Sequence, residues 1–342
     1  MPSYRTGRVV EILAERRGLQ RVTVTVGDGD PERAYVLTQL TGDVAVGDRV
    51  VLNTTAVDLG LGTGGWHVVH WNLEREQWSE PGPGHIMKLR YTSLQADTGA
   101  AEEALGDSLP TRIDGVQVVV CSLHSQVGVV AAAIAAERPD TRVAYVMTDG
   151  AALPLALSDL VADLADRSLV HHTITAGHAF GGDLEAVTVP SALTLATHHL
   201  GAEVIVVGMG PGVVGTGSTL GTTAIEAAAV LDQVRALGGA GLICPRMSDG
   251  DDRQRHRGLS HHTATVLDLV GGPVQLPWPA PPPPDGYDPH VVVAVEVPDV
   301  EAMLGRFELS ITSMGRGPAD DPLFFAAAAA AGLVAARHCH PA

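Results

Sequence analysis

Residues 202–244 read AEVIVVGMGPGVVGTGSTLGTTAIEAAAVLDQVRALGGAGLIC and carry the pattern that decides the fold. An apolar, β-branched run (204–207) enters a glycine-rich loop (208–221), and a helix-like segment (223–239) then leads to a second apolar run (241–244). Short apolar runs bounded by glycine are typical of buried strands, whereas the longer Ala- and Leu-rich segment between them is typical of a helix. A strand, a helix and a strand in this order predict a βαβ unit with parallel strands.

The same alternation recurs before and after this stretch. Apolar, strand-like runs lie at 115–123, 141–148 and 168–177, and helix-like segments separate them. Parallel strands joined by helices form a sheet that is covered on both faces. Residues 111–342 are therefore predicted to form an α/β domain with a mainly parallel sheet flanked by helices. The run at 291–297 is expected to add a strand at the sheet edge.

The pattern is different in the first part of the chain. Five short β-branched runs between residues 4 and 73 are separated by Gly- and Asp-containing turns, with no helical pattern of comparable length between them. Several short strands with regular turn signals are typical of a small barrel. We predict a β-barrel-like domain over residues 1–80 and a connector over residues 81–110.

The composition limits the classes of partner. The 342 residues are 45% hydrophobic and carry a net charge of −17. Such a field repels nucleic acids and anionic membrane surfaces, so we expect neither as a partner. The apolar segment 323–336 is too short for a bilayer, and the start lacks the apolar core of a secretory signal, so a cytoplasmic location is expected. The densest basic cluster, 252–258, follows an acidic run and is interpreted as a solvated loop.

The three cysteines give no disulfide framework. Cys121 and Cys244 both lie in strand-like apolar runs, where a thiol behaves as a small buried hydrophobe. We therefore expect them to be inert core residues.

Five segments together resemble a known family. They are LNTTAVDLGLGTGGWHVV (52–69), GHIMKLRYTSLQ (84–95), CSLHSQ (121–126), GHAFGGDLEAV (177–187) and GMGPGVVGTGSTLG (208–221). This set resembles an uncharacterised bacterial family, domain of unknown function 3866, over nearly the whole chain. The resemblance supports the division into two parts, and it implies no activity, cofactor or catalytic residue.

The glycine loop (208–221) is the strongest candidate for a ligand site. It follows a strand and precedes a helix, and backbone N–H groups at such a place favour anions. Lys88 is the chain's one lysine, and we expect it to supply the positive charge. The expected anion-binding residues are Lys88, Gly210, Gly212, Gly215, Thr216, Gly217 and Ser218.

Two other interpretations of the loop stay open. The glycines could serve a close backbone crossing or a subunit contact. Residues 210–215 also fit the GxGxxG pattern of dinucleotide sites, although the acidic residue expected about 20 positions later at a strand end is missing.

Polar residues at other strand ends supply candidate catalytic groups. His124, Asp149 and His178 each follow a predicted strand, and the carboxyl ends of parallel strands meet at one edge of a sheet. A histidine with a carboxylate is sufficient for general acid–base chemistry near neutral pH. No metal site is assigned, because the side chains of neighbouring histidines such as His261 and His262 are expected to diverge. A metal site assembled from His124, Asp149 and His178 stays open as an alternative.

Two functions follow as hypotheses. The first is an enzyme, a transferase or hydrolase acting on a small anionic metabolite or nucleotide, with no cofactor assigned. The second is a non-catalytic ligand-sensing or homo-oligomeric assembly protein whose glycine-rich loops form subunit contacts. The segment 323–336 is apolar nearly all round, so it needs cover from the chain's own sheet or from a second subunit. We expect a homodimer or a higher homo-oligomer.

Overall fold

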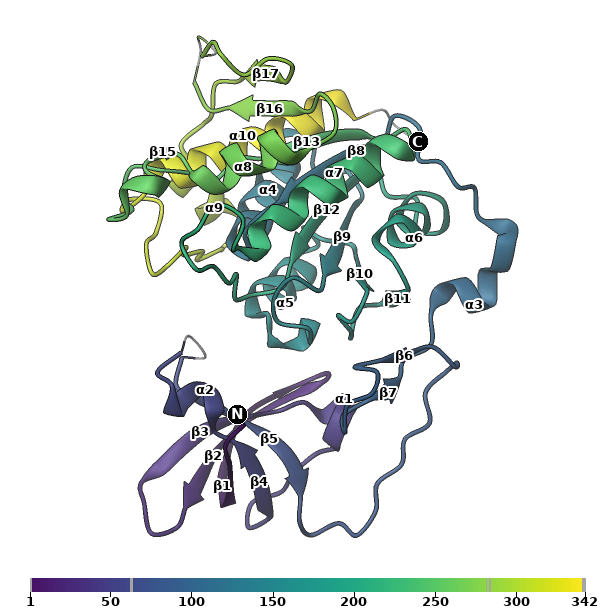
Figure 1. Ribbon diagram of the computed structural model, residues 1–342, viewed down its shortest axis with the longest axis vertical. Helices are drawn as coiled ribbons and strands as arrows, with labels where there is room; N and C mark the ends of the chain where they lie inside the picture. The colour runs from purple at the N-terminus through teal and green to yellow at the C-terminus, as the bar shows by residue number, and fades with distance from the viewer. Residues whose placement is uncertain (1, 62–63, 281, 283, 340–342) are drawn as a thin grey trace. The chain divides into compact units, whose positions relative to one another are not determined.

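The computed structural model describes residues 2–61, 64–280, 282 and 284–339 (Figure 1). The chain divides into two compact units, Met1–Gly99 and Ala100–Ala342. Each unit contains its own buried apolar core.

The N-terminal unit is a closed five-stranded barrel, as the sequence predicts. The strands run in the order β1-β2-β3-β5-β4, with β3 and β5 parallel and the other pairs antiparallel. This order, with a helix between β3 and β4, is that of five-stranded OB-type barrels. The elements are β1 (Tyr4–Arg16), β2 (Leu19–Val26), β3 (Pro31–Val36), α1 (Thr38–Thr41), β4 (Arg49–Asn53), α2 (Thr55–Asp58) and β5 (Trp66–Asn72).

Buried and half-buried residues alternate along the barrel strands, which is why the sequence pattern predicts them. Val22 and Val24 of β2 are buried, while Arg21, Thr23 and Thr25 are half-buried, so one face of the strand fills the barrel. The short hairpin of β6 (Met87–Lys88) and β7 (Ala96–Asp97) follows the barrel and belongs to the same unit.

The C-terminal unit is an α/β domain around an eight-stranded sheet in which every neighbouring pair is parallel. The strand order is β11-β10-β9-β12-β8-β13-β16-β17. The strands are β8 (Gln117–Cys121), β9 (Val143–Thr148), β10 (His172–Ala176), β11 (Leu184–Ala186), β12 (Val204–Met209), β13 (Ala240–Cys244), β16 (Gln275–Trp278) and β17 (Val291–Ala294). The predicted fold class is confirmed, and β17 is the edge strand expected from the run at 291–297.

Helices cover both faces of this sheet (Figure 1). One face carries α4 (His124–Glu137), α5 (Asp159–Asp166), α9 (Val300–Arg306) and α10 (Pro322–His338). The other carries α6 (Val189–Thr194), which continues as the π-helical turn η3 (Leu195–His199), with α7 (Glu226–Ala236) and α8 (His261–Leu269). The remaining short elements are α3 (Ala101–Leu105), η1 (Gly106–Ser108), η2 (Leu155–Leu157), η4 (Thr223–Ile225), β14 (Met247–Ser248), η5 (Gln254–His256) and β15 (Gly258–Leu259).

The Ala-rich helix α10 is covered by its own chain. It packs on α4 and against β13 and β16, and most of its side chains are fully buried. The approach to α4 is close: a methyl group at Gly332 would lie 2.5 Å from the carbonyl oxygen of Val130. The apolar surface of α10 therefore gives no support to a second subunit. Within the described part of the chain, none of the helices has the length and apolar character required to cross a membrane.

Strand β12 creates a topological switch point in the sheet. It lies between β9 and β8, and its connection runs through α7 on one face, whereas β8 connects through α4 on the opposite face. In open parallel sheets, ligands bind beyond the carboxyl ends of strands at such a point. The glycine loop, which follows β12, starts there.

Two cysteines face each other in the centre of the sheet. Cys121 of β8 and Cys244 of β13 are register partners on neighbouring strands, and both are buried. Burial and the neighbouring Cys121 raise the pKa of the Cys244 thiol well above its usual value. The Cys244 thiol is thus protonated, and both side chains are shielded, as expected for core residues.

Candidate ligand site at the carboxyl edge of the sheet

His124 begins α4 directly after β8, and both of its ring nitrogens have partners. Nδ1 lies 3.1 Å from the carbonyl oxygen of Met209, and Nε2 lies 2.6 Å from Oγ of Ser158. A carbonyl only accepts, so Nδ1 carries the proton and the Ser158 hydroxyl donates to Nε2. Burial lowers the pKa of His124 to about 4, which keeps the ring neutral. This geometry favours a structural role, in which the ring ties the ends of β8 and β12 to the cap of α5.

Asp149 follows β9 and meets the turn that contains His178. Its Oδ2 accepts a hydrogen bond of 3.1 Å from the backbone N–H of His178, and the side chain packs against Gly177, whose φ is +67°. The structure thus brings these two predicted residues together through the main chain of His178.

Glu226, which the sequence analysis does not single out, stands beside Asp149. It is the first residue of α7, and a methyl group at Gly150 would clash with its Oε2. Burial raises the pKa of Glu226, the nearby Thr148 hydroxyl lowers it in part, and the negative charge of Asp149 raises it, for a net increase. Its Oε2 is buried and accepts no hydrogen bond from the described residues. A carboxyl group with a raised pKa beside a second carboxylate is a common arrangement for proton transfer.

The glycine loop forms an exposed hairpin of its own. Thr216 N–H donates to the carbonyl of Gly221 at 2.8 Å, and the hydroxyls of Thr216 and Ser218 lie 2.9 Å apart. Ser218 Oγ also accepts from the N–H of Gly221 at 3.1 Å, so both predicted hydroxyls already have partners within the loop. Among the described residues, the N–H groups of Gly217, Ser218 and Thr219 have no acceptor, and all three residues are exposed.

The glycines of the loop serve different purposes. A side chain at Gly210 would clash with the carbonyl oxygen of Ala152, so this glycine permits a close backbone crossing. Gly212 and Gly217 have φ values of +99° and +85°, which favour glycine for conformational reasons. The structure thus supports the packing interpretation at Gly210 and leaves the tip of the loop open to a ligand.

Arg255 provides a positive charge at this tip. A methyl group at Gly217 would lie 3.6 Å from Nη2 of Arg255, so the guanidinium stands next to the loop. Arg255 is exposed, and among the described residues no carboxylate pairs with it. Helix α8, which follows Arg255 in the chain, packs against η4, which follows the loop.

The basic cluster 252–258 is anchored on a buried carboxylate rather than being a freely solvated loop. Asp251 is 1% exposed and accepts from Arg253 at 2.8 and 2.9 Å, from Arg316 at 3.3 Å and from Arg246 at 3.4 Å. The Arg253 guanidinium holds the pKa of Asp251 well below its usual range. This network fixes the loop that carries Arg255.

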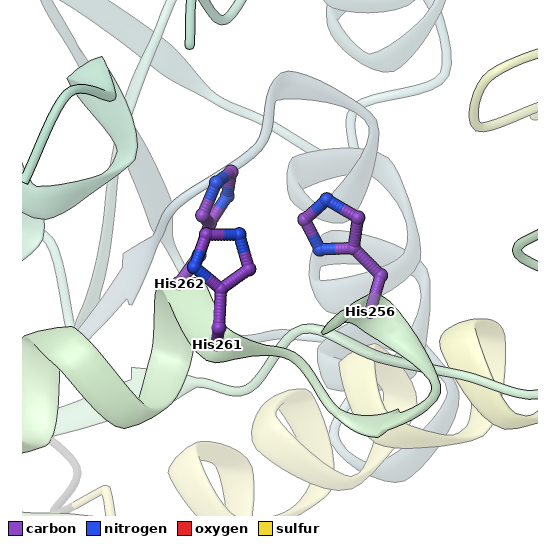
Figure 2. A group of neighbouring side chains, drawn as sticks. All are labelled: His256, His261 and His262. Atoms are coloured by element: carbon purple, nitrogen blue, oxygen red, sulfur yellow. The ribbon is translucent and has the colours of Figure 1, made fainter. Parts of the chain in front are cut away.

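Three histidine rings gather next to this network. The ligand nitrogens of His256, His261 and His262 all lie within 4.8 Å of one another, and Figure 2 shows His256 facing the other two rings. The rings of His261 and His262 are 4.3 Å apart at their centroids. The expectation that neighbouring histidines diverge therefore does not hold at the start of α8, where the first turn lets both rings reach the same space.

The remaining predicted residue, Lys88, belongs to the N-terminal unit. It lies on β6 and is buried. Its pairing with an anion at the glycine loop stays a prediction.

A pocket lies elsewhere in the C-terminal unit. It has a volume of about 600 Å³ and is bounded by the C-terminal ends of α4 and α10 and by α9. These helix ends are remote from His124, which starts α4 at the carboxyl edge of the sheet. The pocket is thus separate from the candidate site.

Comparison with known proteins gives a family. The profile of the family described as "Protein of unknown function (DUF3866)" matches residues 33–332. No curated protein and no solved structure gives a significant match.

Proposed function

We propose that this chain, which belongs to the DUF3866 family of proteins of unknown function, is an enzyme acting on a small anionic metabolite or nucleotide. The observation that carries the proposal is the exposed tip of the glycine loop, where open N–H groups stand beside the Arg255 guanidinium. Backbone N–H groups and a guanidinium are the donors that bind phosphate and carboxylate groups. The glycine loop also begins at the topological switch point after β12, where ligands bind in open parallel sheets.

The acid–base chemistry of a hydrolase or transferase is assigned to groups at the neighbouring strand ends. Asp149 and Glu226 form a carboxylate pair beside β9, and His178 is hydrogen-bonded to Asp149 through its backbone. Glu226 is suited to donate a proton, because its raised pKa keeps more of it protonated than an ordinary glutamate. His124 is less suited, because both of its ring nitrogens are engaged.

Ligand binding tests the proposal directly. Isothermal titration of the full chain with inorganic phosphate, pyrophosphate, adenosine monophosphate and citrate, in buffer containing EDTA, is expected to show binding of at least one anion. Arg255→Ala should weaken that binding at least about tenfold, because a hydrogen bond to a charged group contributes about 1.5–3 kcal/mol.

The matched control is Arg235→Ala. Arg235 is paired with Asp232 at the other end of α7, so its removal changes the net charge equally without touching the loop. Equal weakening by the two variants, or the absence of binding to all four anions, would contradict the proposal.

One observation favours the non-catalytic alternative. Val214 and Leu220 of the glycine loop are 63% and 62% exposed, and exposed apolar side chains are frequent at protein contacts. If the loop is a subunit contact, Val214→Asp combined with Leu220→Asp should convert an oligomer to a monomer in light scattering. An unchanged mass would remove this support for the alternative.

A further inference from the structure

The three-histidine cluster is built by a short segment of the chain. His256 ends the turn η5, and His261 and His262 are the first two residues of α8. Ser260 caps α8 by accepting the N–H of His262 at 3.2 Å, and its hydroxyl also lies 2.7 Å from Nδ1 of His256. One serine therefore fixes the helix start and the orientation of the His256 ring, leaving Nε2 of His256 for another partner.

The network behind the cluster holds this segment in place. Arg246, which follows β13, is 4% exposed and donates from its backbone N–H to Thr263 Oγ1 at 2.8 Å. Its guanidinium reaches Asp251 on one side and Nδ1 of His262, at 3.2 Å, on the other. The histidine cluster thus packs against a buried Arg246–Asp251 ion pair, which forms without the histidine rings.

The rings are neutral at physiological pH. Burial and the charge of Arg246 lower the pKa of His256 to about 3 and that of His262 to about 4, and burial and Arg255 lower the pKa of His261. Neutral imidazole is the form that binds metal ions, because a protonated ring has no free lone pair.

One ring nitrogen of the cluster is both buried and unpartnered among the described residues. Nε2 of His261 is buried and has no hydrogen-bond partner among the described residues. Buried polar atoms without partners are uncommon and call for a specific cause. One ring nitrogen from each of the three histidines lies within 4.8 Å of the other two, so an ion placed between the rings would give His261 a partner.

We propose that His256, His261 and His262 form a binding site for a divalent transition metal ion of the zinc class. Three nitrogen donors without a carboxylate suit zinc, cobalt or nickel and do not suit magnesium or calcium. Three histidines leave a fourth position for water or an anion, as in zinc sites with catalytic roles. The site stands on the rings themselves and does not depend on anion binding at the glycine loop.

Two features set conditions on this site. Arg246 donates to Nδ1 of His262, so this ring gives up that hydrogen bond or turns about its Cβ–Cγ bond when the ion enters. The surrounding guanidiniums oppose a cation, but Asp251 and Asp321 neutralise part of their charge. Arg255 beside the cluster favours an anion at the fourth position.

Metal titration of the tag-free full chain tests the proposal. After EDTA treatment and dialysis, the protein is expected to bind one Zn²⁺ per chain by calorimetry and by elemental analysis. Co²⁺ should give the visible absorption of a four-coordinate site. His261→Gln should weaken Zn²⁺ binding at least tenfold, and its half-exposed position makes it the substitution least disruptive to the fold.

His199→Gln is the matched control, since His199 belongs to another histidine doublet and is exposed on η3. It should leave Zn²⁺ binding unchanged, and circular dichroism of the metal-free proteins shows whether each variant is folded. Equal Zn²⁺ binding by the wild type and a folded His261→Gln variant would overturn the proposal, as would no binding by the wild type. Phosphate titration in EDTA tests the glycine loop separately, so either result can fail alone.

Discussion

At the scale of single residues, the buried carboxylate of Asp251 is paired with three arginines in the C-terminal unit. It accepts hydrogen bonds from Arg246 and Arg253, which are close in the sequence, and from Arg316, which is 65 residues away. Without its charge, Arg246 would be left nearly buried with less compensation. The carboxylate therefore organises the segment that presents Arg255 and the histidines.

Asp251→Asn is expected to lower the free energy of unfolding by about 3–5 kcal/mol, because breaking a buried ion pair leaves an uncompensated charge. Urea denaturation, followed through the unfolding transition of the C-terminal unit, measures this change in the free energy of unfolding. Asp163→Asn is the control: its pair with Arg167 is largely exposed and should contribute about 1 kcal/mol or less. Similar losses of unfolding free energy in the two variants would show that the buried Asp251 network stabilises the protein no more than an exposed ion pair does.

At the scale of elements, the crossing of α4 and α10 depends on small residues. Gly332 lies against the backbone of α4, where a methyl group would be 2.5 Å from the Val130 carbonyl and 2.7 Å from Cβ of Ala133. Alanines fill most of the remaining interface. The two helices can approach closely only because these side chains are small.

Gly332→Val should therefore destabilise the protein by about 1–3 kcal/mol, the usual range for overpacking a core. Gly305→Ala in α9 is the comparison, since nothing lies within 4 Å of a methyl group there and its φ is not positive. This second substitution should be neutral or slightly stabilising, because alanine has the higher helix propensity. Thermal unfolding of both variants measures these changes in stability. If Gly332→Val leaves the stability unchanged, the close approach of α4 and α10 does not contribute to it.

The elements also show what a sequence can predict. Parallel strands buried on both faces give continuous apolar runs, which is why β8, β9 and β12 were predictable. Strand β16 was not predicted, because its Pro277 and Trp278 open a proline-rich stretch that favours an extended connector. Helix α9 has no counterpart among the predicted elements, although Asp299 caps it by accepting the N–H of Ala302, and it packs against α4 and α10.

The candidate site was predictable only in its location. Strand ends and a glycine loop identify the carboxyl edge, but the approach of Arg255 to Gly217 joins residues far apart in the sequence. That approach depends on how α8 packs against η4, which no periodicity encodes. The same holds for His256, whose position opposite His261 follows from the turn between them and from Ser260.

At the scale of the whole molecule, acid should weaken the fold through His124. The folded protein holds the pKa of this ring at about 4, whereas an unfolded histidine titrates near 6.5. Between these values the unfolded chain binds a proton that the folded chain does not, so the free energy of unfolding falls as the pH is lowered. One such group contributes up to about 3 kcal/mol, which is present above pH 6.5 and is lost by about pH 4.

Urea denaturation between pH 7 and about pH 4 measures this slope. Other histidines with lowered pKa values add to it, so the informative comparison is with His124→Gln. That variant is expected to be less stable at pH 7 and to have a flatter pH dependence. An unchanged slope would show that His124 has the same pKa in the folded and the unfolded protein.

Because all three cysteines are buried, the rate at which a reagent modifies their thiols reports how often the structure around them opens. A thiol reagent can modify Cys121 and Cys244 only when the neighbouring strands β8 and β13 part, since both side chains are sealed in the interior. Their labelling rate in native buffer therefore gives the frequency of deep excursions, without denaturant and without an introduced probe. Cys339, at the end of α10, should react earlier and record the fraying of that helix alone.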